Sequence, residues 1–227
     1  MIDIHSHILQ GVDDGSVDLD QSIAMLKEEE NQGVTEVVIT PHYRADFLPK
    51  VEDIRTNFAE LKTCAEQNRI NVKLHLGQEI YAFDDIVKAL KEDKVLSIDG
   101  GKYVLVEFST KHFADISETV YMFVKNKYIP IVAHIGRYFY ANIETAREVK
   151  ELGGLVQINA SSVCGPFIFR RKVFAMIKAG LVDFVASDVH HNRKNLMLKA
   201  YQKIEKKFGK ETADKLFTEN AKAIFAN

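Results

Sequence analysis

The chain has 227 residues, of which 46% are hydrophobic and 27% charged, a composition typical of a folded globular protein rather than a disordered one. Its formal net charge of −2 gives no overall positive field, which argues against nucleic acid as a partner. Two cysteines, Cys64 and Cys164, are too few for a disulfide framework, and the length fits one domain spanning 1–227.

The sequence gives no sign of export or of membrane insertion. Asp3 and His5 interrupt the N-terminus before the apolar core of a signal peptide could form. No stretch approaches the roughly 20 apolar residues that span a bilayer. We therefore expect a soluble cytoplasmic protein, and the sequence leaves its oligomeric state open.

Short β-branched apolar runs alternate with longer amphipathic runs along the chain. The short runs, which predict strands, cover 2–5, 35–40, 72–77, 102–108, 129–134, 154–159 and 182–187. The amphipathic runs, which predict helices, cover 19–32, 51–67, 84–92, 115–126, 142–152, 167–179, 194–208 and 211–225. Each helix supplies the crossover that a parallel pairing of the next strand requires.

Two architectures fit this alternation, an open doubly wound sheet and a closed barrel. The predicted strands are nearly continuous apolar runs, as expected when both faces of a parallel sheet are covered. No glycine-rich phosphate loop follows the first strand, as it usually does in an open sheet that binds a nucleotide. We therefore predict an α/β barrel, with seven strands rather than eight.

Six of the seven predicted strands end in residue types that commonly bind metal ions. These residues are His5, His7, His42, Glu79, Glu107, His134, Asp188 and His190. Because the carboxyl ends of parallel strands meet at one edge, we expect the side chains to converge there. Alternate residues of an extended chain point to the same side, so His5 and His7 can bind one ion together. Asp14 is a ninth candidate, and Asp3 has the parity needed to orient a ligand imidazole.

Nine ligands exceed the needs of one ion and suit two or three, with a carboxylate such as Glu79 as a bridge. Imidazole combined with carboxylate suits manganese, iron or zinc. Clustered divalent ions generate a hydroxide at neutral pH and hold phosphoryl oxygens, which predicts a phosphoesterase. Arg137 and Arg193 each follow a candidate histidine by three residues, where they could bind a phosphate.

Several motifs resemble those of the PHP (polymerase and histidinol phosphatase) superfamily. They are MIDIHSHILQGVDDGS, TPHYR, GQEIY, VLVEF, AHIGRY, SDVHH and TENAKAIF, and they run over essentially the whole chain. The opening HSHILxGxDDG pattern most closely resembles the CpsB/YwqE-type branch, manganese-dependent protein-tyrosine phosphatases of bacterial capsule and exopolysaccharide loci. The resemblance implies a distorted (β/α)7 TIM-like barrel of the PHP type. It also implies a phosphotyrosine protein as substrate, with a bacterial tyrosine kinase as the expected partner.

The resemblance further implies a site for three divalent ions, with manganese expected and iron or zinc as alternatives. The first ion would be held by His5, His7, Glu79 and Asp188. The second would be held by Glu79, Glu107 and His134, and the third by Asp14, His42 and His190. Arg137, Arg193 and Asp14 are the expected catalytic residues, in a hydrolysis by a metal-bound hydroxide without a covalent enzyme intermediate.

One stretch departs from that branch. Where its members usually have His-Pro-Glu-Arg, this chain has His134-Ile135-Gly136-Arg137. The histidine and the arginine are retained, but the rigid proline and the acid are not. The loop geometry and the fit of a substrate at this point are therefore left open.

Other functions remain alternatives on the sequence alone. A histidinol phosphatase, a TatD-like nuclease or an amidohydrolase could use a similar barrel, although a nuclease favours a basic groove. A metal-bearing regulatory protein that docks a tyrosine kinase belongs to a different class. Cys164 and Arg170 match the bare Cys-x5-Arg spacing of thiol phosphatases. The stretch between them, GPFIF, has a proline and two phenylalanines in place of the small, glycine-rich interior that cradles phosphate.

Overall fold

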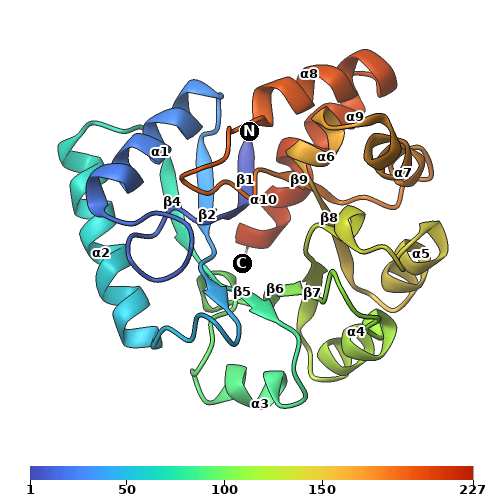
Figure 1. Cartoon of the computed structure of the whole chain (residues 1–227), viewed down its shortest axis with the longest axis horizontal. Helices are drawn as coiled ribbons and strands as arrows, with labels where there is room; N and C mark the ends of the chain where they lie inside the picture. The colour runs from blue at the N-terminus through green and yellow to red at the C-terminus, as the bar shows by residue number, and fades with distance from the viewer. Residues whose placement is uncertain (227) are drawn as a thin grey trace.

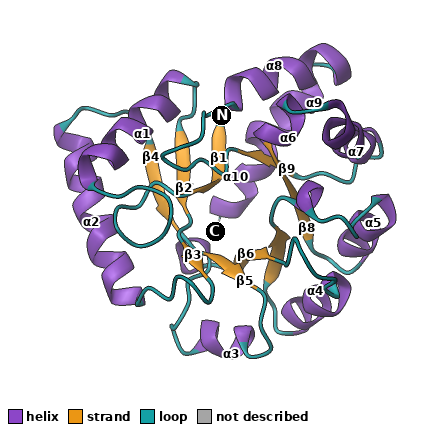
Figure 2. Ribbon diagram, in the orientation of Figure 1, coloured by secondary structure: helices purple, strands orange, loops and turns teal. Residues whose placement is uncertain are grey.

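The computed structural model describes residues 1–226, so Asn227, the last residue of the expected domain, lies outside the described residues. Parallel strands form a ring that is surrounded by helices (Figures 1 and 2). The strands are β1 (Ile2–Ser6), β2 (Glu36–Ile39), β3 (His42–Tyr43), β4 (Lys73–Leu76), β5 (Glu79–Tyr81), β6 (Tyr103–Glu107), β7 (Ile129–Val132), β8 (Leu155–Asn159) and β9 (Phe184–Ala186). Each predicted strand is present, and two more short strands follow those expected at 35–40 and 72–77.

The hydrogen bonding divides the ring into two parallel sheets. One has the order β1-β2-β4 and the other the order β3-β5-β6-β7-β8-β9. The chain passes directly from the first sheet into the second at two points, since β2 continues into β3 after two residues and β4 continues into β5 likewise. Between them it returns to the first sheet through α2. On the opposite side, the His7 N–H donates to the Val189 carbonyl at 3.0 Å and the Asp188 N–H donates to the His5 carbonyl at 2.9 Å, which joins the first and last strands. The predicted α/β fold with a parallel, barrel-like sheet is confirmed.

The helices lie mostly outside the ring, and α10 lies inside it (Figure 2). They are α1 (Leu19–Asn31), α2 (Val51–Gln67), α3 (Ile86–Lys91), α4 (Ile116–Lys125), α5 (Ile143–Glu151), α6 (Ala160–Cys164), α7 (Phe167–Lys178), α8 (Met197–Phe208), α9 (Lys210–Asp214) and α10 (Asn220–Phe225). Three short helical turns complete them: η1 (Ile98–Gly100), η2 (Ile135–Arg137) and the π-helical η3 (Lys215–Glu219). The expected helix at 211–225 is thus interrupted by a π turn, and α6 was not expected.

Side-chain caps fix where some helices begin. Asp18 accepts the backbone N–H of Gln21 at the start of α1, and Asn142 forms a capping box with Thr145 at the start of α5. Within residues 1–226, none of the helices combines the length and the apolar character needed to span a bilayer.

Two layers of apolar packing determine which end of the ring is open. The larger layer lies between the strands and the outer helices. The smaller lies inside the ring, where Ile2, Ile4 and Phe184 pack against Ala221 and Ile224 of α10. Because Ile2 and Phe184 begin their strands, α10 fills the amino end of the barrel, and polar side chains are left to gather at the carboxyl end.

Candidate metal centre

All nine candidate ligands lie toward the carboxyl end of the barrel, in the strands or in the loops that follow them. His5 belongs to β1, His42 begins β3, Glu79 begins β5 and Glu107 ends β6, and the other five lie in the loops that follow β1, β7 and β9. The additional strands matter here, because His42 and Glu79 are register partners across β3 and β5. Eight of the nine side chains are buried, and only Asp14 is exposed.

The candidates form four overlapping groups in which the potential ligand atoms lie within 4.8 Å of one another. The groups are His7, Asp14, His42 and His190; His5, Glu79 and His134; His5, His7 and Asp188; and His42, Glu79 and Glu107. Every candidate therefore takes part in a cluster. The groups overlap the three expected ligand sets without matching them, since His7 also approaches the set expected for the third ion.

Glu79 occupies the middle of the cluster. One of its oxygens, Oε1, lies 2.8 Å from Nε2 of His134 and 3.3 Å from Nε2 of His5. The other, Oε2, lies 2.9 Å from Nδ1 of His42 and 3.3 Å from Nε2 of His7. Burial alone would raise the pKa of Glu79, but the charges of His5 and His134 hold it well below its ordinary value. A central carboxylate with imidazoles on both oxygens has the arrangement of a bridging ligand.

The donor set fits divalent cations. Nε2 of His5 and Nε2 of His7 are only 3.2 Å apart, close to the roughly 3.4 Å expected when two nitrogens share one ion at about 2.1 Å in tetrahedral geometry. Within residues 1–226, buried atoms of the cluster lack any hydrogen bond of acceptable geometry, among them Glu79 Oε2, Glu107 Oε2, His42 Nδ1 and His190 Nε2. Unsatisfied buried groups of this kind are costly unless another group binds them. Cations would satisfy carboxylates and neutral imidazoles together.

Both expected arginines converge on Asp188. Nη1 of Arg137 and Nη1 of Arg193 each lie 3.3 Å from Oδ2 of Asp188, and the same oxygen accepts the Asn159 amide at 2.6 Å. Burial would raise the pKa of Asp188, but neighbouring histidines, His5 foremost, lower it to about 2. Asp188 therefore stays ionised and fixes the two guanidinium groups beside the cluster.

A cavity of about 420 Å³ adjoins this corner of the cluster. Its walls are Thr110, Gly136, Arg137, Asn159, Ser161, Ser162, Pro166, Asp188 and Arg193. The stretch 134–137 lacks the proline and the acid of the His-Pro-Glu-Arg pattern. Its first residue, His134, has a left-handed backbone with φ 30°, and the η2 turn follows. This turn carries Arg137 to Asp188 without the proline.

The sequence did not identify several residues that support the site. Asp13 accepts a hydrogen bond from the His7 ring at 2.8 Å, although only the neighbouring Asp14 was selected. Gln157 and Asn159 belong to β8, which corresponds to the one predicted strand without a typical ligand at its end. Gln157 accepts the His134 N–H at 2.6 Å. The sequence did contain a sign of this role, because Gln157 and Asn159 place amide side chains where other predicted strands have candidate ligands.

The prediction that Asp3 orients a ligand imidazole is wrong. Asp3 does not reach a ligand imidazole, because its Oδ1 accepts the backbone N–H groups of His5 and Ser187 instead. Arg44 was also missed. Its guanidinium lies 3.3 Å from Asp14 Oδ2 and stacks over the Phe47 ring at the same rim.

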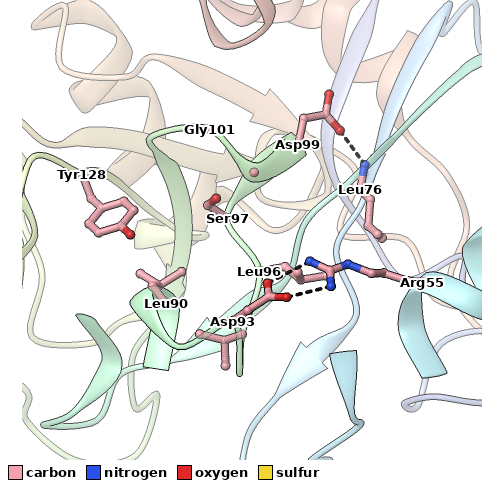
Figure 3. A pocket seen from close by; sticks show the side chains of 11 residues that line it. Arg55, Leu76, Leu90, Asp93, Leu96, Ser97, Asp99, Gly101 and Tyr128 are labelled. Carbon is pink, nitrogen blue, oxygen red and sulfur yellow. Dashed lines mark hydrogen bonds and ion pairs between the residues drawn. The ribbon is translucent and has the colours of Figure 1, made fainter. Parts of the chain in front are cut away.

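A second cavity of about 420 Å³ lies elsewhere, between α2, α3 and η1. None of the nine candidate ligands lines it. Figure 3 shows that its charged groups are already paired: Arg55 binds Asp93 through two bonds of 2.7 and 2.8 Å, and Asp99 accepts the Leu76 N–H. The carboxyl rim of the barrel is therefore the stronger candidate for chemistry.

Comparison with known proteins agrees with this geometry. A family model described as capsular polysaccharide synthesis, CpsB/CapC, matches residues 1–226. The chain is 34% identical to the tyrosine-protein phosphatase CpsB of Streptococcus agalactiae, over 100% of this chain and 99% of that protein. It is 33% identical to the tyrosine-protein phosphatase YwqE of Bacillus subtilis, over 100% and 92%.

A solved structure shares the fold along almost the whole chain. It comes from work on YwqE of Bacillus subtilis and CpsB of Streptococcus pneumoniae, described as unique metal-dependent tyrosine phosphatases. The TM-score is 0.88 at 29% sequence identity, covering 94% of this chain and 90% of the other.

Proposed function

The chain belongs to the CpsB/CapC family of capsular polysaccharide synthesis proteins, and we propose that it is a metal-dependent protein-tyrosine phosphatase. The observation that carries the proposal is the clustering of nine ligand-type side chains, Glu79 and Asp188 among them, beside a cavity that presents two arginines. Its substrate would be a phosphotyrosine protein, and a tyrosine kinase that controls capsule or exopolysaccharide synthesis is the proposed source. Because such a kinase uses ATP, we place the reaction in the cytoplasm.

Three divalent ions, with manganese proposed, would be bound by the nine clustered side chains. His5, His7, Glu79 and Asp188 would hold the first ion; Glu79, Glu107 and His134 the second; Asp14, His42 and His190 the third. When bound, such ions activate a water molecule at neutral pH and neutralise charge on a phosphoryl group. The buried atoms without hydrogen-bond partners support this assignment.

Arg137 and Arg193 would bind the phosphoryl oxygens that face the cavity. Both side chains are partly exposed while their Nη1 atoms contact Asp188. Among the described residues, 1–226, the other N–H groups of each guanidinium make no hydrogen bond, so they could bind an anion. Planar guanidinium groups bind phosphate through paired hydrogen bonds and stabilise the charge that grows on its oxygens. The phenol of tyrosine, with a pKa of about 10, is a good leaving group compared with an alcohol.

A cysteine nucleophile does not fit this site. Cys164 is absent from the walls of the cavity beside Arg137. Burial raises the pKa of its thiol, which reduces the thiolate fraction that would attack phosphorus. We therefore propose direct hydrolysis, without a phosphoenzyme.

The decisive experiment compares substrates before and after metal exchange. The chelated protein should lose p-nitrophenyl phosphate turnover and regain it with manganese, and a phosphotyrosine peptide should be cleaved faster than histidinol phosphate. His42→Ala and Glu107→Ala should abolish turnover while circular dichroism stays unchanged. Faster cleavage of histidinol phosphate would reassign the substrate, and no turnover with any divalent metal would favour a docking protein.

A further inference from the structure

The rim around the proposed active site is electrically asymmetric. Four segments follow β6, β7, β8 and β9 at the carboxyl end: 109–114, 135–142, 160–172 and 189–196. They contain seven Lys and Arg residues: Lys111, Arg137, Arg170, Arg171, Lys172, Arg193 and Lys194. The acids at their edges are Asp115, just before α4, and Asp188, which contacts Arg137 and Arg193. The loops after β1 and β5 are instead acidic, with Asp13, Asp14 and Asp18 in one and Asp84 and Asp85 in the other. The loop after β3 is mixed, with Arg44, Asp46 and Lys50, and Arg44 pairs with Asp14. In a chain whose net charge is −2, most of the positive charge of the rim therefore lies on the half that follows β6 to β9.

The same half of the rim exposes large aromatic rings. Phe113, Phe139 and Phe167 are 76%, 69% and 69% exposed. Tyr140 lies between the first two, with ring centroids 5.4 Å from Phe113 and 5.1 Å from Phe139. Tyr138, whose centroid is 5.6 Å from that of His134, stacks on Tyr140 at 5.7 Å. A continuous row of rings thus leads from the cluster to the surface, and exposed apolar groups of this kind mark interaction sites.

The charged and aromatic segments are neighbours in space as well as in topology. The cavity beside Asp188 has walls from all four: Thr110, Arg137, Ser161 and Arg193 represent one each. A further hollow of about 380 Å³ lies between the start of α5 and the first turns of α7, with Ile168 and Arg171 among its walls. We call the surface formed by these four segments the basic rim.

We propose that the basic rim binds acidic residues flanking the phosphotyrosine of an extended substrate segment. The inference rests on the proposed phosphatase function, because it begins from phosphotyrosine bound at Arg137 and Arg193. At about 3.4 Å per residue, three or four residues of extended peptide run about 10–14 Å beyond the phosphotyrosine and so across the rim. Carboxylates there would meet Lys111, Arg171 and Lys194, and apolar side chains would meet Phe113 and Phe139. The rim would thereby select substrates rather than carry out chemistry.

The test compares two phosphotyrosine peptides that differ only in having Glu or Gln at the flanking positions. The wild type should cleave the Glu peptide with a kcat/KM about tenfold higher, and the ratio should fall as salt rises, because exposed charges are screened. The triple variant Lys111→Gln/Arg171→Gln/Lys194→Gln should bring the ratio close to one and leave p-nitrophenyl phosphate turnover unchanged.

A matched control removes three other exposed lysines. The variant Lys62→Gln/Lys125→Gln/Lys206→Gln removes the same net charge as the basic-rim triple variant, but from α2, α4 and α8. It should preserve the ratio of kcat/KM between the Glu and Gln peptides. Phe113→Ala/Phe139→Ala should weaken cleavage of both peptides but not of p-nitrophenyl phosphate, whereas Tyr121→Ala, at an exposed ring on α4, should change neither.

The outcomes separate this inference from the proposed function. Equal wild-type cleavage of the two peptides would overturn the substrate preference and leave the phosphatase intact. An equal loss of preference in the control triple variant would show that net charge, rather than the basic rim, is responsible. Failure to cleave either peptide, with p-nitrophenyl phosphate still hydrolysed, would count against the phosphotyrosine function itself.

Discussion

Asp13 and His7 form a hydrogen bond of 2.8 Å on the side of the imidazole that faces away from Glu79 and Asp188. The other ring nitrogen of His7 lies 3.3 Å from Glu79 and 3.5 Å from Asp188. Asp13 also accepts the backbone N–H groups of His42 and Gly15, each at 2.9 Å. Burial would raise the pKa of Asp13, but His7 holds it far below its ordinary value. Asp13 therefore fixes the ring so that Nε2 faces the cluster.

Removing the hydrogen bond between Asp13 and His7 should weaken metal binding more than it weakens the fold. We expect Asp13→Ala to lower the affinity for divalent ions about 10–100-fold, the usual effect of losing a group that orients a ligand. Elemental analysis and titration calorimetry would measure the loss directly, without reference to turnover. Asp20→Asn, at an exposed acid in α1, is the control and should bind metal normally. Unchanged ion content and affinity in Asp13→Ala would contradict the orienting role.

Metal removal should also lower thermal stability. The cluster buries the carboxylates of Glu79, Glu107 and Asp188 close together, and without cations they repel one another. Ions at about 1,000 times their dissociation constant add about 4 kcal/mol to the free energy of unfolding, which corresponds to roughly 8–16 °C in Tm for a chain of this size. Differential scanning fluorimetry after chelation, followed by addition of manganese, iron, zinc or magnesium, would measure the shift. A Tm that does not change on chelation would argue against buried ions.

Periodicity was sufficient to predict most of the secondary structure. The helix expected at 51–67 coincides with α2, because its apolar stripe is regular and uninterrupted. The division of two strands into β2–β3 and β4–β5 was not predictable, because the transfers at 40–41 and 77–78 depend on how the barrel closes. The π turn η3 within 211–225 was likewise hidden, since hydrophobic spacing alone does not distinguish an α-helical turn from a π turn.

The composition of the site was easier to predict than its geometry. A ligand-type residue at the end of a parallel strand is visible in the sequence, and this rule selected His42, Glu79 and Glu107. The direction of each side chain is not visible, so the sequence could not show that His7 also approaches Asp14. Supporting contacts such as Asp13 with the His42 backbone join distant segments and require the tertiary structure.

One buried histidine with two carboxylates, at the amino end of the barrel, should make the stability of the fold depend on pH. His75 lies 2.5 Å from Asp99 and 3.0 Å from Glu36, and its ring stacks on Phe225 of α10 at 3.9 Å. Partial burial acts in the opposite direction, but hydrogen bonds from His75 lower the pKa of Asp99 and of Glu36. Lowered carboxyl pKa values stabilise the fold above the ordinary pKa of about 4, and the gain is lost as the pH falls through the lowered values.

We therefore expect His75→Gln to lower the Tm by about 2–4 °C at pH 6, as the loss of about 1 kcal/mol would. The difference from wild type should narrow as the pH falls from about 4 through the lowered pKa values of Asp99 and Glu36, where the wild-type carboxylates become protonated too. Arg55→Gln breaks the exposed pair with Asp93 and is the control, since pairs of that kind contribute about 0–1 kcal/mol. A Tm difference that stays constant from pH 6 to pH 3 would assign the effect to packing on Phe225 instead.

The glycine that replaces the expected acid, Gly136, is held in contact with α7. A Cβ added at Gly136 would lie 2.7 Å from Cγ1 of Val173, closer than real carbon atoms approach. Overpacking of this kind costs about 1–3 kcal/mol, so Gly136→Ala should lower the Tm by about 2–12 °C and reduce phosphotyrosine cleavage by displacing Arg137.

Val173→Ala removes the obstructing methyl group, so adding it to Gly136→Ala should recover stability even though Val173→Ala alone destabilises the core. Denaturant unfolding of the four proteins in this double-mutant cycle would give the coupling energy. Strict additivity of the two substitutions would mean that α7 does not restrict residue 136, and the glycine would then need another explanation.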